Sequence, residues 1–80
     1  MNIKEIANKI DIDIQRKEDI NECPKFQEVK EITSILRGDV GYFIEGDCYI
    51  QTSIDDCDDG WFNAYYDENW NLIDYHWEGI

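Results

Sequence analysis

The sequence has no lysine or arginine beyond Arg37, because all seven precede residue 38. The whole chain carries 19 acidic residues against these seven, for a formal net charge of −12. A protein that binds nucleic acid directly needs a surface of lysine and arginine, and anionic membranes likewise attract basic segments. The charge balance therefore argues against direct nucleic-acid binding and against binding to an anionic membrane.

Long apolar runs are absent as well, since none approaches the roughly 20 residues that span a bilayer. Met1–Ile10 is amphipathic and carries Glu5, which does not fit a secretory signal peptide. The three cysteines, Cys23, Cys48 and Cys57, are odd in number and show no paired spacing, so they do not form a disulfide framework. We therefore expect a cytoplasmic protein.

Motifs for catalysis and metal binding are scarce. There is no CxxC, phosphate loop or dinucleotide fingerprint, and His76 is the only histidine. The segment 55–60 partly fits a calcium loop, but Cys57 occupies its third position and Tyr66 stands where a bidentate glutamate belongs. His76 shares a predicted strand face with Asp74, yet no nucleophile is placed beside them. We predict no enzymatic activity, no cofactor and no metal.

Apolar and aromatic residues, in contrast, are plentiful. Hydrophobic residues make up 42% of the chain and aromatics 14%, which predicts a folded protein despite the charge. Eighty residues form one small domain. At this size folding buries only about 60% of the surface of the unfolded chain, so we expect modest stability.

Two helices are predicted in the first half of the chain. Residues 2–10 carry isoleucines at helical spacing, with Asn2 as the N-cap. Residues 24–37 place Phe26, Val29, Thr33 and Leu36 on one helical face, and Gly38 follows as a C-terminal cap. The intervening residues 11–21 first alternate and then become polar, which predicts an irregular segment or a short edge strand.

After Gly38 the apolar period changes to two, which is the period of a strand. We predict strands at 40–44 and 48–54 around a turn at Gly46, and at 61–66 and 70–77 around a turn at residues 67–69. The inner face of the second hairpin is expected to carry Phe62, Ala64, Tyr66, Ile73, Tyr75 and Trp77. The predicted fold is α+β, with two helices packed on one face of a four-stranded antiparallel meander.

The second half combines carboxylates with aromatic rings. Residues 38–80 hold eleven of the 19 acids and ten of the eleven aromatics. Eleven like charges without internal counter-charge repel one another, so a fold that tolerates them usually offers their field to something outside. One end of the predicted meander gathers Glu45, Asp47, Asp67 and Glu68, and the other gathers Asp39, Asp55, Asp56, Asp58, Asp59 and Glu78. Asp74 lies between the ends on the outer face, for which Tyr49, Trp61, Tyr65 and Trp70 are the aromatic candidates.

In size, in the segregation of its charge and in this acidic, aromatic half, the chain resembles the small acidic proteins that phages and mobile elements use against host defence. These are the anti-CRISPR and anti-restriction inhibitors of the type that mimics DNA. The resemblance covers composition and no motif, so it assigns a role to no residue. It implies a nucleic-acid-handling effector as partner, blocked at its DNA- or RNA-binding surface.

The sequence thus predicts a non-enzymatic inhibitor that binds the basic surface of a nucleic-acid-binding protein. The expected partner-binding residues are Glu45, Asp47, Asp55, Asp56, Asp58, Asp59, Asp67, Glu68 and Asp74, with Trp61 and Trp70 as anchors. The alternatives are an immunity or antitoxin protein that neutralises a basic nuclease, a small acidic metal-binding domain, and an acidic structural domain whose aromatics are all core. We expect a monomer or a weak homodimer, because strand edges favour pairing and the charge opposes it.

Overall fold

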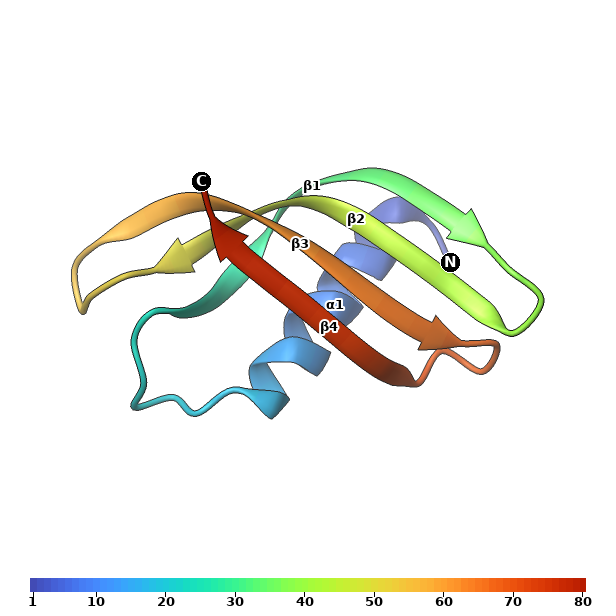
Figure 1. Cartoon of the computed structure of the whole chain (residues 1–80), viewed down its shortest axis with the longest axis horizontal. Coiled ribbons are helices and arrows are strands. Elements are labelled where there is room, and N and C mark those ends of the chain that lie inside the picture. The colour runs from blue at the N-terminus through green and yellow to red at the C-terminus, as the bar shows by residue number, and fades with distance from the viewer.

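One helix and one four-stranded antiparallel sheet make up the computed structural model, which describes all residues, Met1–Ile80. The elements are α1 (Ile3–Lys17), β1 (Lys25–Arg37), β2 (Gly41–Gln51), β3 (Cys57–Asp67) and β4 (Leu72–Gly79). The strands neighbour one another in chain order, and α1 crosses one face of the sheet (Figure 1). The α+β class is therefore confirmed, whereas the prediction of two helices is wrong. The sheet has four antiparallel strands, but they are not the four predicted ones, because β1 takes the place of the second helix and β2 replaces the two strands predicted at 40–44 and 48–54.

The helix α1 begins where the sequence predicts it. The Asn2 side chain accepts the Glu5 N–H at 2.8 Å, and the Glu5 carboxylate accepts the Asn2 N–H at 3.3 Å, which completes a capping box. The helix then continues through residues 11–17, where the alternation suggests a strand. Ile10 and Ile14 lie one turn apart and are fully buried, while the intervening Ile12 faces solvent.

The second predicted helix is instead the edge strand β1. Its register against β2 shifts at three places, between Phe26 and Glu28, between Val29 and Glu31, and after Ile32. Such shifts are β-bulges, each of which inserts an extra residue into the strand. As a result, the residues that pack toward the core follow one another at intervals of three, as Phe26, Val29 and Ile32 do. Spacing of three imitates a helix, and this explains the wrong prediction.

The predicted turn at Gly46 is also wrong, because β2 runs through it as a single strand. Gly46 is buried between β1 and the core, and a Cβ built on it would lie 2.1 Å from the Glu31 carbonyl oxygen. The same Cβ would lie 2.8 Å from the ring of Phe62. The glycine therefore permits a close approach of strand, strand and ring inside the sheet.

The core lies between α1 and the sheet. Its buried members are Ile6, Ile10 and Ile14 from the helix and Phe26, Ile44, Cys48, Ile50, Phe62, Ala64 and Tyr66 from β1, β2 and β3. Phe26 meets Phe62 edge to face, with ring centroids 6.1 Å apart. Of the residues expected on the inner face of β3 and β4, Ile73 alone is exposed, because a register shift follows Tyr65 at this point.

Polar contacts attach the helix to the last two strands. The Tyr66 hydroxyl donates to Asp13 at 2.8 Å in a partly buried position at the border of the core. Glu18, at the end of α1, accepts hydrogen bonds from the Trp77 indole N–H at 2.7 Å and from the Tyr75 hydroxyl at 3.0 Å. These bonds hold β4 against the helix and so determine which face of β4 remains open to solvent.

Candidate partner-binding face

The face of the sheet turned away from α1, here called the outer face, is open to solvent. Residues that stand opposite each other on neighbouring strands share a face, so the register defines rows across the sheet. One row holds Leu36, Phe43, Tyr65 and Asp74; the next holds Ser34, Glu45, Asn63 and His76; the third holds Glu31, Asp47, Trp61 and Glu78. Neighbours within a row are about 4.8 Å apart and successive rows about 7 Å apart.

Carboxylates dominate the outer face. A further row holds Glu28, Tyr49 and Asp59, so the acidic residues of the face are Glu28, Glu31, Glu45, Asp47, Asp59, Asp74 and Glu78. Lys30 is the one lysine that pairs with them: its Nζ lies 3.5 Å from Asp59 and 5.5 Å from the ring centroid of Tyr49. His76 contacts Glu78 at 3.1 Å. Both pairs are about half exposed and therefore weak, so most of the negative charge of this face is not balanced within the chain.

Aromatic rings stand among these carboxylates. Trp61 is 38% exposed and its ring centroid lies 5.4 Å from that of His76. Phe43 and Tyr65 pair across β2 and β3, with their centroids 4.5 Å apart. The expected outer-face position of Tyr49, Trp61 and Tyr65 is thus observed. Rings set among charges are typical of protein interfaces, where aromatic residues are enriched.

The acids predicted at the ends of the sheet are arranged differently from the expectation. Glu45 and Asp47 lie in mid-strand, because β2 does not turn at Gly46. Asp39 instead shares an end with Asp67 and Glu68, because residues 38–40 and 68–71 are the connections at that end. The correction moves two carboxylates from a hairpin tip to the middle of the outer face.

Asp67 acts within the β3–β4 turn. Its carboxylate accepts the backbone N–H groups of Asn71 at 2.9 Å and Asn69 at 2.8 Å, and the Asn71 side-chain amide at 3.1 Å. The two bonds from Asn71, followed by that from Asn69, hold the pKa of Asp67 below its ordinary value. Asp67 therefore stabilises the turn, while its neighbour Glu68 is exposed and makes no side-chain bond.

The remaining predicted acids lie at the opposite end, where β2 leads into β3. Asp55 and Asp58 are exposed, and Asp56 accepts the Ser53 hydroxyl at 3.0 Å. Asp58 and Asp59 line an open hollow of about 370 Å³ together with Tyr49 and residues of β1. Asp55 and Asp56 thus extend the negative charge beyond the ends of β2 and β3, whereas Asp58 and Asp59, predicted in a loop, belong to β3.

Trp70, the second predicted anchor, lies on the opposite side of the sheet. Its ring stacks on that of Tyr42, with ring centroids 4.2 Å apart, and its centroid lies 5.5 Å from that of the Tyr66 ring. Both tyrosines belong to the side that carries α1, and Trp70 packs there against the core. Trp70 therefore covers the end of the core and is not a residue of the outer face.

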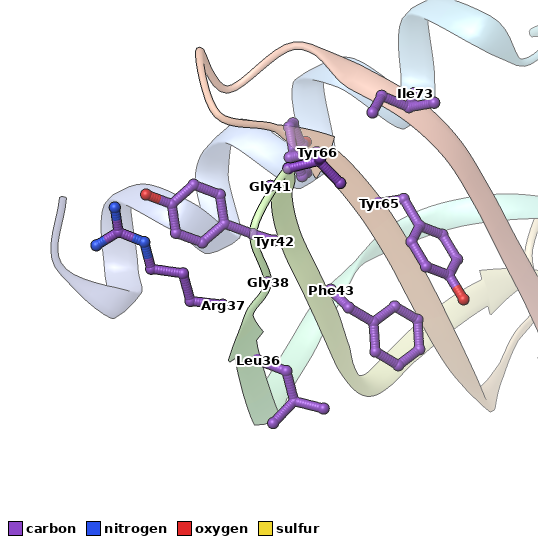
Figure 2. A pocket seen from close by; sticks show the side chains of 10 residues that line it. Leu36, Arg37, Gly38, Gly41, Tyr42, Phe43, Tyr65, Tyr66 and Ile73 are labelled. Atoms are coloured by element: carbon purple, nitrogen blue, oxygen red, sulfur yellow. The ribbon is translucent and has the colours of Figure 1, made fainter.

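An apolar hollow at the end of the outer face was not predicted from the sequence. Leu36, Val40, Phe43, Tyr65 and Ile73 are five of its ten lining residues, and its volume is about 290 Å³. Figure 2 shows Phe43 and Tyr65 on one side of the sheet and Tyr42 with Arg37 on the other. The alternation of β2 could have placed Phe43 outward, but Leu36 and Ile73 follow register shifts that leave no signal in the sequence.

A metal site and a membrane span find no support in the arrangement. No three side chains of histidine, cysteine, aspartate or glutamate come close enough together to hold a metal ion. The single helix has neither the length nor the apolar character needed to cross a membrane. Comparison with models of known protein families, with curated proteins and with solved structures yields no match.

Proposed function

We propose that the protein is a non-enzymatic inhibitor whose outer face occupies the basic, nucleic-acid-binding surface of another protein in the cytoplasm. The observation that carries this proposal is the composition of that face. Seven carboxylates share this face with Trp61, two of them directly opposite it on β2 and β4, and Lys30 is the only lysine or arginine paired with them. A lysine- and arginine-rich groove that binds phosphates would accept carboxylates arranged in this way.

The size of the face suits such an interface. The molecule measures 40 Å by 22 Å across its two longest axes. Their product, about 880 Å², is an upper limit for the footprint of the face, so an interface of the standard size of roughly 800 Å² per partner would involve nearly the whole face. Figure 1, viewed along the shortest axis, shows the four strands spread across most of this area.

Electrostatics would bring the partners together, and Trp61 would retain them. Charge complementarity mainly accelerates association and falls off within a Debye length of about 8 Å at physiological ionic strength. Aromatic anchors near the centre of an interface contribute more to the binding free energy than charges at its rim do. Truncation of such an anchor weakens binding by about 2 kcal/mol or more. Binding should therefore weaken at high salt and should weaken further when Trp61 is removed.

The composition narrows the class of partner. The resemblance to anti-CRISPR and anti-restriction inhibitors favours a host defence effector that handles nucleic acid. The exposed thiols of Cys23 and Cys57 are free, which fits a reducing compartment such as the cytoplasm.

The test is capture of proteins from a host lysate at low and high salt, followed by mass spectrometry. The informative variant is Glu45→Lys with Asp47→Lys, and its matched control is Asp19→Lys with Glu22→Lys. Both double variants change the net charge by four. The control residues are exposed in the connection between α1 and β1, away from the outer face, where Glu22 makes no side-chain bond and Asp19 accepts only the N–H of Asn21. We expect the wild type and the control to capture the same DNA- or RNA-binding protein at low salt.

The Glu45 and Asp47 double variant should fail to capture that protein. When the partner is loaded with nucleic acid, addition of the wild-type inhibitor should release the nucleic acid. Equal capture by the two double variants would mean that net charge, and not the outer face, is responsible. Capture of a partner that continues to hold nucleic acid would refute inhibition by occupation of its binding surface.

A further inference from the structure

The apolar hollow is the least expected feature of this charged protein. Leu36 is 59% exposed and Ile73 is 64% exposed, and both lie beside the paired rings of Phe43 and Tyr65. Exposed apolar groups that gather on one surface of a small protein commonly mark an interaction site. Nothing within the chain covers this one, because α1 lies on the other face of the sheet.

The position of the hollow links it to the carboxylates of the outer face. Phe43 precedes Glu45 by two residues on β2, so their side chains leave the same face about 7 Å apart. Tyr65 stands directly opposite Asp74 on β4. Glu45 and Asp74 do not line the hollow, but each stands next to one of its aromatic residues on the same face, so negative charge lies beside it.

The basic residue that lines the hollow does not neutralise this charge. The guanidinium of Arg37 lies 5.8 Å from the ring centroid of Tyr42. Figure 2 shows both side chains directed away from Phe43 and Tyr65. The surroundings of the hollow thus favour a ligand that is apolar at its centre and positive around it.

We propose that this hollow receives one large apolar side chain from a lysine- and arginine-rich segment of the partner. This inference rests on the proposed function and specifies the chemistry of the partner. The volume of about 290 Å³ is just below the range for ligand pockets, about 300–1,000 Å³, and suits a single side chain. A second copy of the chain is a poor occupant, because it would bring another net charge of −12 against the same carboxylates.

Two synthetic peptides test the proposal with the intact chain. Both are seven residues long with six lysines and arginines, and they differ only in the central residue, which is tryptophan in one and serine in the other. Binding is followed by NMR titration of the labelled protein at low and high salt. We expect both peptides to bind in a salt-sensitive manner, and the tryptophan peptide to bind at least about tenfold more tightly.

A double variant tests whether the hollow is responsible for the difference in affinity between the two peptides. Leu36→Ser with Ile73→Ser removes two walls of the hollow, and its control, Ile20→Ser with Ile54→Ser, removes two isoleucines that are exposed elsewhere. All four residues are more than half exposed, so both variants should fold. The first should bind the two peptides equally, while the control should retain the tenfold difference.

The outcomes separate this inference from the function on which it rests. Equal, salt-sensitive binding of both peptides by the wild type would refute the role of the hollow and leave the proposed function standing. Persistence of the tenfold difference in the Leu36 and Ile73 variant would also refute it. Absence of salt-sensitive binding by either peptide would count against both the role of the hollow and the proposed function. If the free protein self-associated and the Leu36 and Ile73 variant did not, the hollow would instead be assigned to a second copy of the chain.

Discussion

Replacement of Gly46 by alanine is expected to destabilise the protein severely. The added Cβ would lie 2.1 Å from the carbonyl oxygen of Glu31 and 2.8 Å from Cε1 of Phe62. The first of these atoms belongs to the backbone of a paired strand, so no side-chain rotation relieves the clash. Either β1 moves away from β2 or the strand pairing is broken at this point.

The size of the effect follows from this geometry. Overpacking of a well-packed site usually costs about 1–3 kcal/mol, and a clash against backbone belongs at or above the upper end of that range. A domain of 80 residues has a total stability of roughly 4–12 kcal/mol. We expect Gly46→Ala to lower the free energy of unfolding by at least about 3 kcal/mol, and to lower the melting temperature by more than about 12 °C.

Urea unfolding followed by circular dichroism measures this loss, and Gly79→Ala provides the matched control. A Cβ at Gly79 has no neighbour within 4 Å, so this variant should be as stable as the wild type or slightly more stable. If Gly46→Ala retained stability within about 0.5 kcal/mol of the wild type, β2 could not pass through residue 46 as a strand packed against Phe62. The turn that the sequence suggests at this position would then be restored.

Three further predictions concern groups that lie on the helix side of the sheet. Glu18→Ala removes the acceptor of two hydrogen bonds, from Tyr75 and from Trp77, and should lower the free energy of unfolding in urea by about 2 kcal/mol. Burial, together with the bond to Glu18, raises the pKa of Tyr75 to about 12. The folded state therefore holds the phenol proton more tightly than the unfolded chain, so the free energy of unfolding should fall as the pH rises from about 10 to 12. Urea unfolding measured across this pH range should show a smaller fall for Tyr75→Phe than for the wild type. Burial raises the pKa of the Cys48 thiol to about 11. Iodoacetamide at neutral pH should therefore label Cys23 and Cys57 in the folded protein and Cys48 only in urea, which mass spectrometry would show. Rapid labelling of all three cysteines in the folded protein would contradict the burial of Cys48.

Local signals in the sequence identified the elements that depend on local interactions. The beginning of α1 could be predicted because Asn2 and Glu5 form its capping box within four residues of chain. The inner face of β3 could be predicted because Phe62, Ala64 and Tyr66 alternate without a bulge. In both cases the interaction that decides the structure lies close in the sequence.

The prediction failed where distant contacts decide. Phe26, Val29 and Ile32 have helical spacing, but three bulges in the pairing with β2 produce that spacing in a strand. Gly46 has the sequence context of a turn, but its partners Glu31 and Phe62 come from other strands. Trp70 has the character of an exposed anchor, but it packs on Tyr42 and Tyr66 on the helix side of the sheet.

The sequence by itself determined that the second half of the chain carries eleven acids and no lysine or arginine, because charge is a property of composition. It could not determine where these acids would point. Only the tertiary structure placed Glu45 and Asp47 beside Trp61 on one open face, because α1 covers the other face and the register of β2 sets the direction of each side chain. A shift of one residue in that register would have turned the same carboxylates into the core.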